Sequence, residues 1–474
     1  MRTIRSNRRH RLGLVALAGA CVVVAAACGN QLDHQKIVDA AAASGKASSL
    51  SGSSFAGTPS GGGTGGAIGA GDQSGTGTAA DGGAGGTTTG QGATTAGPAA
   101  GASANASSPG LTTPGQTGPI VIGSIGHQSG IPGSAGADMS RAVRLWASVI
   151  NKKGGLFGRP VQVIVVDDGG DPARFQAGLQ DLVENRHVVA FVGNYAAVTA
   201  DSGDAYLTRA KVPVIGTDCT RPVYDTSANY LNECGPADIS FSGPLLAGAK
   251  SGAGNKLAIL YCGESQICKD GAAGARKGAP AAGMSVVYEA QVSLTQPDFT
   301  AECISARNAG ATVLFPAVDG TGAERVAVSC SRQGYKPTFV FGSNGNKDAP
   351  KKTGLENAAM GLPIFPFTGS SVPAAQEFYK AWGDAYGGIS QSSGAMGWAS
   401  AKLFELIATK AVQTSHSLTP QTLFVAGRTI KGETLGGLVG ALDLTAPGRN
   451  PSCYWALHGK NGGWEALNDA KASC

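Results

Sequence analysis

Short apolar runs alternate with helix-like segments through most of the chain. Each run is five to seven residues long, and the first is closed by glycines, as a buried strand of a parallel sheet would be. The predicted strands are residues 120–126, 161–166, 188–193, 212–216, 257–262, 285–290, 312–316 and 338–342. This alternation predicts an α/β fold with parallel sheets wrapped by helices. The folded part begins at Pro119, and its length of about 355 residues predicts two lobes.

Capping signals place two of the helices. Residues 137–152 carry apolar side chains on one helical face, and Gly154 and Gly155 follow as a stop. Asp171 and Pro172 begin another helix, because aspartate caps a helix N-terminus and proline suits the first turn.

The N-terminus has the pattern of a secretory signal peptide. Residues 1–27 contain no acidic residue, and a basic segment precedes an apolar run at residues 12–27. That run is shorter than the roughly 20 residues that a helix needs to cross a bilayer, and no later stretch is long enough. The basic segment contains Arg2, Arg5, Arg8, Arg9 and Arg11. Without these arginines the chain has 32 basic and 32 acidic residues. Because the net charge is then zero, nucleic acid is not an expected partner.

Cys28 is the expected site of lipid attachment. Residues 24–30 resemble a bacterial lipobox, although Ala25 stands where leucine is usual. The resemblance implies an exported protein anchored by lipid to the outer face of the cytoplasmic membrane. The alternative is an ordinary signal cleavage site beside an incidental cysteine. Cys21 is a poorer candidate, because fewer apolar residues precede it.

Residues 28–118 are predicted to be a disordered linker. From about residue 47 they are almost entirely Gly, Ala, Ser, Thr and Pro, and such a segment cannot bury enough apolar surface to fold. A flexible chain of about 90 residues has a root-mean-square reach of roughly 50 Å. That reach suits a domain tethered away from a membrane.

Eight cysteines follow Cys28, and an even number in an exported protein favours disulfides. They lie in four close sequential pairs, which short loop closure favours. We therefore expect bonds joining Cys219 to Cys234, Cys262 to Cys268, Cys303 to Cys330, and Cys453 to Cys474. Neither the cysteines nor the histidines have metal-binding spacings, so no metal is expected.

Several segments resemble a known family of receptors. The most specific are residues 150–160 (INKKGGLFGRP), the strand and turn at residues 161–172, Phe191-Val192-Gly193 and residues 212–216. Together they resemble the type I periplasmic binding proteins, in particular the leucine/isoleucine/valine-binding receptors of ABC transporters. The resemblance extends over nearly all of residues 119–474.

The resemblance implies two Rossmann-like lobes joined by three crossovers, near residues 238, 363 and 446. Lobe I is expected to contain residues 119–238 and 364–446, and lobe II residues 239–363 and 447–474. The family implies a small molecule held between the lobes and delivered to an ABC transporter permease. We expect a monomer without a cofactor. Ligands of such sheets bind at the carboxyl ends of the strands, where backbone amides and helix N-termini converge.

The resemblance also places candidate ligand contacts. The loop after the third strand aligns with a segment that binds the ligand carboxylate in relatives, but Ala197 stands at the key serine position. In the second lobe Asn344 falls near the position of an acidic residue that pairs with the ligand ammonium, and Asp319 is a possible substitute. The full set of expected contacts is Ser129, Tyr195, Ala196, Ala197, Thr199, Cys219, Thr220, Asp319 and Asn344.

These departures argue against a standard α-amino acid, because a buried ammonium without a partner is costly. We expect a small polar molecule: amino acid-like, an amide or an organic acid. One alternative is a receptor domain that signals to a partner protein, since the fold alone does not separate sensing from transport. A remoter alternative is a secreted hydrolase with Gly263-Glu264-Ser265 as a nucleophile elbow, in which Ile267 replaces the final glycine.

Overall fold

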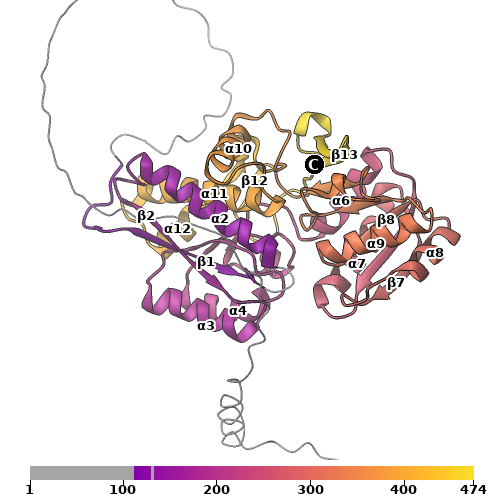
Figure 1. Cartoon of the computed structure of the whole chain (residues 1–474). Coiled ribbons are helices and arrows are strands. Elements are labelled where there is room, and N and C mark those ends of the chain that lie inside the picture. The colour runs from indigo at the N-terminus through magenta and orange to yellow at the C-terminus, as the bar shows by residue number, and fades with distance from the viewer. Residues whose placement is uncertain (1–110, 130–132) are drawn as a thin grey trace, which may run out of the picture. The chain divides into compact units, whose positions relative to one another are not determined.

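The computed structural model describes residues 111–129 and 133–474 (Figure 1). The signal peptide, the lipid attachment at Cys28 and nearly all of the linker lie outside these residues. The described chain forms a five-stranded sheet, a seven-stranded sheet and a two-stranded ribbon of β11 (Lys431–Glu433) and β12 (Leu442–Asp443).

The five-stranded sheet is entirely parallel. Its order is β2 (Val161–Asp167), β1 (Ile120–Gly126), β3 (Phe191–Asn194), β4 (Val214–Thr217) and β5 (Tyr230–Leu231). β1 has the predicted bounds, and Ile122 and Ile125 are fully buried on its opposite faces. β3 and β4 begin later than predicted.

Helices cover both faces of this sheet (Figure 1). α2 (Gly133–Lys152) and α11 (Ser392–Ser415) lie on one face, and α3 (Pro172–Gln180) and α4 (Ala200–Ala210) on the other. Asp171 caps α3 as predicted, because its carboxylate accepts the Arg174 N–H at 2.8 Å. The remaining helices near this sheet are α5 (Val223–Thr226), α10 (Pro373–Tyr386) and α12 (Pro420–Gly427).

The seven-stranded sheet is mostly parallel, as predicted, with an antiparallel hairpin at one edge. β7 (Ser285–Val292), β6 (Lys256–Cys262), β8 (Val313–Ala317), β9 (Thr338–Phe341) and β10 (Ala359–Leu362) run parallel. β13 (Trp455–Lys460) and β14 (Gly463–Ala466) continue the sheet antiparallel to β10 as a hairpin. Its helices are α6 (Asp238–Lys250), α7 (Gln266–Gly278), α8 (Thr300–Asn308) and α9 (Gly320–Arg332).

The chain passes three times between the two sheets. It does so between β5 and α6, between β10 and α10, and between β12 and β13. The fold is therefore the predicted pair of Rossmann-like lobes with three crossovers. The residue limits of the lobes, near 238, 363 and 446, stay predictions.

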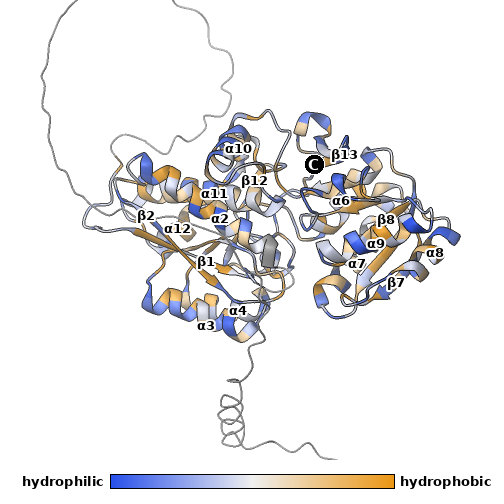
Figure 2. Cartoon of the chain, viewed as in Figure 1, coloured by the Kyte–Doolittle hydropathy of each residue, from blue (hydrophilic) through white to orange (hydrophobic). Residues whose placement is uncertain are grey.

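Many strand residues are hydrophobic (Figure 2), and the helices add buried apolar residues such as Trp146 and Trp398. The structure contains the four cysteine pairs expected from the sequence. Within the described residues, no helix combines the length and the apolar character that a membrane span requires.

Candidate functional site

The carboxyl ends of β1 to β4 present four loops along one edge of the five-stranded sheet. The loops begin at His127, Asp168, Tyr195 and Asp218, each directly after its strand. Parallel strands direct their carboxyl ends to one edge, where α/β proteins bind ligands. Seven of the nine predicted contacts lie in these loops, at residues 129, 195, 196, 197, 199, 219 and 220.

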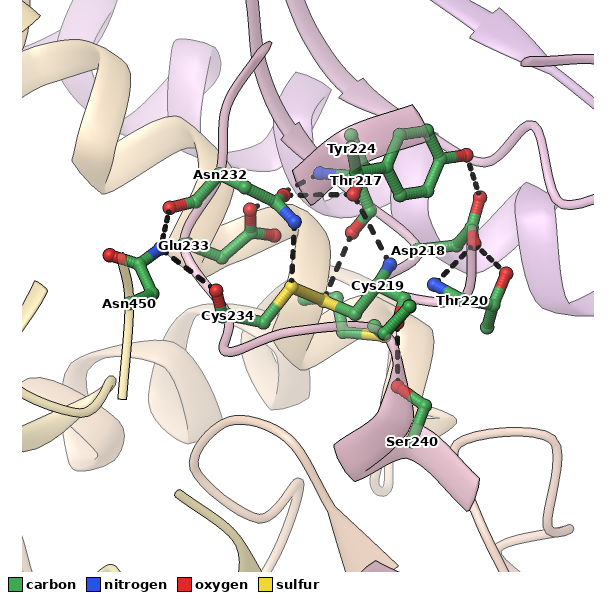
Figure 3. The surroundings of a disulfide bond; sticks show 12 residues. Thr217, Asp218, Cys219, Thr220, Tyr224, Asn232, Glu233, Cys234, Ser240 and Asn450 are labelled. Atoms are coloured by element: carbon green, nitrogen blue, oxygen red, sulfur yellow. Dashed lines mark hydrogen bonds between the residues drawn. A yellow bond between two sulfur atoms is a disulfide. The ribbon is translucent and has the colours of Figure 1, made fainter. Parts of the chain in front are cut away.

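Asp218 organises two of these loops. Its Oδ2 accepts the Ala196 N–H at 2.8 Å. Oδ2 also accepts the Tyr224 hydroxyl at 2.8 Å, and Oδ1 accepts the Thr220 N–H at 3.1 Å and the Thr220 hydroxyl (Figure 3). The side chain is fully buried. Burial and the nearby Asp218 charge raise the pKa of Tyr224 well above its usual value. The carboxylate thus satisfies donors that the sequence assigned to a ligand.

Protein carboxylates bind other predicted donors as well. The Thr199 hydroxyl donates to Asp168 Oδ2 at 2.7 Å, and the Ser129 N–H donates to Asp167 Oδ1 at 3.2 Å. Although desolvation opposes it, hydrogen bonds from Ser129, Gln128 and Gly169 lower the pKa of Asp167 to about 2. The hydroxyl protons of Thr199 and Thr220 are therefore already donated to protein carboxylates. Towards a ligand, these two hydroxyls can only accept a hydrogen bond.

The remaining predicted contacts of the first sheet are mostly apolar. Tyr195 and Ala197 are each 7% exposed, and Val198 beside them is 37% exposed. Burial raises the pKa of the Tyr195 phenol, so the phenol is neutral. Cys219 is buried in its disulfide, and its backbone has a positive φ of 65°. The loop thus exposes Val198, with an aromatic ring and small apolar side chains buried beside it.

Two predicted contacts of the second sheet have structural partners. Asp319 caps α9, since its Oδ1 accepts the N–H groups of Thr321 at 2.9 Å and Gly322 at 3.0 Å. The Asn344 amide donates to Val318 O at 3.3 Å. A ligand ammonium here would meet the half-exposed Asp319 cap and a neutral amide.

The proposed nucleophile elbow is a strand-to-helix turn. Ser265 is the N-cap residue of α7, and the Cys262–Cys268 disulfide closes the turn. Glu264 accepts the Leu294 N–H at 3.0 Å and also the Ser293 hydroxyl. Across the described ranges, no group of His, Cys, Asp and Glu is arranged to hold a metal ion.

Arg221, in the loop after β4, binds one helix beside each of the two sheets. Its guanidinium binds Asp201 of α4 at 2.7 Å and Asp270 of α7 at 2.7 Å. Burial alone would lower the pKa of Arg221. The hydrogen bonds and negative charges of Asp201 and Asp270 have the larger combined effect and raise it. Sequence reasoning missed Arg221, although an arginine between Thr220 and Pro222 in a strand-end loop is a visible signal.

The start of α11 is a second contact between the lobes that sequence reasoning missed. The Ser392 hydroxyl donates to Ser343 O, and the Lys347 N–H donates to Gln391 Oε1 at 2.9 Å. The Ser390 and Ser393 hydroxyls are buried without a partner among the described residues. Such groups usually have a partner, so both serines are candidate ligand contacts.

The Cys219–Cys234 disulfide links the loop after β4 to the first crossover (Figure 3). Asn450, near the third crossover, donates to the carbonyls of Asn232 at 2.9 Å and Cys234 at 2.8 Å. Ser240 of α6 donates to Cys219 O at 2.7 Å. The candidate site is thereby joined to the segments that connect the lobes.

Glu233, in the same segment, is a fully buried acid. The Ser400 hydroxyl donates to its Oε1 at 2.7 Å and the Thr217 N–H to its Oε2 at 3.2 Å. Burial raises the pKa of Glu233 from 4.5 to about 7. A raised native pKa means that the folded state binds the proton more tightly, so this stability is present below pH 4.5 and lost as pH rises through about 7.

We expect the free energy of unfolding to fall by roughly 2 to 3 kcal/mol across that pH range because of Glu233. Urea unfolding at a series of pH values measures it. The Glu233→Gln variant should lose this part of the pH dependence, whereas Glu356→Gln at an exposed position should keep it. Equal pH profiles for the wild type and Glu233→Gln would contradict the expectation.

Two α/β lobes, with loops at the carboxyl ends of their parallel strands where ligands bind, are the architecture of a two-lobed solute receptor. The chain belongs to the periplasmic binding protein family, whose sequence profile matches residues 119–463. This membership identifies the chain as an extracytoplasmic solute-binding protein. The family consists of solute-binding proteins and not of enzymes.

Solved structures share the fold. A fatty acid ABC transporter substrate-binding protein from Thermomonospora curvata is 18% identical with a TM-score of 0.64, over 76% of this chain and 95% of that one. A solute-binding protein from R. palustris in complex with benzoate is 15% identical with a TM-score of 0.61, over 75% and 98%. A branched chain amino acid ABC transporter protein from Thermus thermophilus with bound valine is 17% identical with a TM-score of 0.64, over 74% and 96%.

Proposed function

We propose that this protein is the solute receptor of an ABC transporter, which captures a small organic molecule between its lobes and delivers it to the permease. The observation that carries the proposal is the family match over residues 119–463. The link from Arg221 to Asp270 supports it, because that ion pair joins the loop after β4 in one lobe to α7 in the other. Closure of such lobes on a ligand is driven by contacts that form only in the closed state.

The ligand that we propose is an organic acid or amide with an apolar part and no ammonium group. The apolar part suits the loop of Tyr195, Ala197 and Val198. A ligand ammonium would need a negatively charged partner in the second lobe. Asn344 has a neutral amide there, and Oδ1 of Asp319 already accepts hydrogen bonds from the start of α9. The receptors of similar fold that bind a fatty acid or benzoate agree with this ligand class.

A thermal-shift screen tests the proposal. Benzoate, benzamide, octanoate and L-valine would be added to the purified protein with its disulfides intact. Ligand at about 100 times its dissociation constant adds about 2.7 kcal/mol of stability. We expect at least one of the first three compounds to raise the melting temperature and L-valine not to do so. Stabilisation by L-valine alone would contradict the ligand class.

We also propose that the protein binds its solute without transforming it. Ser265 belongs to a turn closed by a disulfide, and Glu264 is engaged with residues 293 and 294. Incubation of the stabilising compound with the protein, followed by mass spectrometry, should return the compound unchanged. Turnover would instead favour the hydrolase.

We further propose that Cys28 carries lipid and anchors the protein to the membrane. Replacing it by serine should move the protein from the membrane fraction to the medium, because the anchor supplies the hydrophobic attachment. Fractionation and immunoblotting measure the distribution. Cys21→Ser is the matched control and should stay with the membrane; release by Cys21→Ser and retention of Cys28→Ser would assign the anchor to Cys21.

A further inference from the structure

The first turn of α11 is buried and lacks a cap. Gln391 precedes the helix, but its side chain forms no hydrogen bond to the turn, because its Oε1 accepts the Lys347 N–H at 2.9 Å. Among the described residues, the N–H groups of Ser392 and Ser393 have no acceptor. Ser392 is nonetheless buried, and Ser393 is completely so. A buried helix start normally binds a side chain, a water or a ligand through such groups.

Two hydroxyls at the same turn also lack a partner. Ser390 is 1% exposed, and within the described ranges neither its Oγ nor that of Ser393 forms a hydrogen bond. Ser390 packs on the turn, since a Cβ on Gly394 would lie 3.0 Å from Ser390 Oγ. The side chain of Ser393 tilts toward the start of the helix, as helical side chains do. Buried hydroxyls without a partner are costly, so both point to a bound group.

The charges around this turn favour an anion. The N-terminus of a helix carries a partial positive charge, and α11 has 24 residues. The Lys347 ammonium reaches the same segment and donates to Ile389 O at 2.7 Å. Asp138 accepts the Gln391 N–H at 3.1 Å, but its negative charge is opposed by Arg141 at 2.9 Å. A carboxylate at the turn would therefore meet N–H donors, hydroxyls and an ammonium.

The turn lies where the two lobes meet. On one side the Gln391 N–H binds Asp138 of α2, which covers the five-stranded sheet. On the other side the turn contacts the segment after β9 of the seven-stranded sheet, through the Ser392 hydroxyl on Ser343 O and the Lys347 N–H on Gln391. A group bound at this turn would thus contact both lobes, as the proposed function requires of the solute.

We propose that the start of α11 is a carboxylate-binding subsite for the solute. The N–H groups of Ser392 and Ser393 and the hydroxyls of Ser390 and Ser393 donate to the carboxylate oxygens. Lys347 supplies the opposing charge. This inference rests on the proposed function and narrows its ligand class, because a site of this kind selects an organic acid over the corresponding amide.

Acetate and acetamide test the subsite, because they have the same shape and differ in charge. The purified protein with isotope-labelled serine would be titrated with each compound by NMR at constant ionic strength. We expect acetate to shift the backbone amide signals of Ser392 and Ser393 to saturation. Acetamide should bind roughly fivefold or more weakly, since hydrogen bonds to a charged group are the stronger ones. Amide signals that do not respond to acetate, or that respond equally to acetamide, would overturn the inference.

Serine variants test the hydroxyl donors. Ser390→Ala and Ser393→Ala should each weaken acetate binding roughly tenfold, as loss of a hydrogen bond to a charged group requires. Ser415→Ala, at the exposed end of the same helix, is the matched control and should bind acetate like the wild type. Unchanged acetate affinity in both Ser390→Ala and Ser393→Ala would overturn the inference. If benzoate or octanoate stabilises the protein in the thermal-shift screen but acetate does not bind, the subsite is wrong and the proposed function stands.

Discussion

Replacing Asp218 by alanine is expected to lower the free energy of unfolding by about 3 to 5 kcal/mol. The alanine leaves the Ala196 and Thr220 N–H groups and the Tyr224 hydroxyl without their acceptor. Asp218 is fully buried, so little water is available to replace the lost bonds. Urea unfolding followed by circular dichroism, with the disulfides intact, measures the loss.

The Asp218→Asn variant tests the reason for this loss. The two backbone N–H groups point at different oxygens, Ala196 at Oδ2 and Thr220 at Oδ1. Whichever oxygen becomes an amide nitrogen, one N–H then faces another donor. We expect asparagine to cost about 1 to 3 kcal/mol, between wild type and alanine. Asp384→Ala, at an exposed position of α10, should change stability by less than about 0.5 kcal/mol. A loss below about 1 kcal/mol for Asp218→Ala would contradict this account of the site.

Much of the fold is predictable because burial and capping act locally. The apolar run at residues 120–126 is β1, and Asp171 caps α3, as the sequence indicated. The β13–β14 hairpin was missed although Asn461-Gly462 is a strong turn signal. Both residues have positive φ, 53° and 74°, as the tight turn requires. The short strands β5 and β10 carry no comparable signal, since their pairing depends on distant parts of the chain.

The site was less predictable than the fold. Its loops follow from the strand ends, so residues such as Tyr195 and Thr220 were placed correctly at the sheet edge. Their partners were not foreseen, because Asp218 and Ala196 are 22 positions apart and meet only when β3 and β4 pair. The contact between Arg221 and Asp270 spans 49 positions and both sheets. Spacing along the chain gives no information on such contacts.

The Cys219–Cys234 disulfide is expected to contribute about 3 kcal/mol to stability, because it closes a loop of sequence separation 15 in the unfolded chain. A double Cys219→Ala/Cys234→Ala variant removes the bond without leaving a lone thiol. Removal of the disulfide should destabilise one region in particular. The bond joins the loop after β4 to the first crossover, and Asn232 donates to Cys234 Sγ at 3.1 Å. Hydrogen exchange should therefore rise first at residues 218–222 and 232–235, ahead of the second sheet.

The Cys262–Cys268 bond is the matched comparison. It spans only 6 positions, so loop entropy predicts a smaller loss of about 2 kcal/mol for the corresponding double alanine variant. Its effect should remain near the turn between β6 and α7. If both variants lose equal stability, loop closure does not explain the difference between the two bonds. If Cys219→Ala/Cys234→Ala instead leaves exchange at residues 218–222 unchanged, the disulfide does not hold the candidate ligand loop, and Asp218 alone orders it.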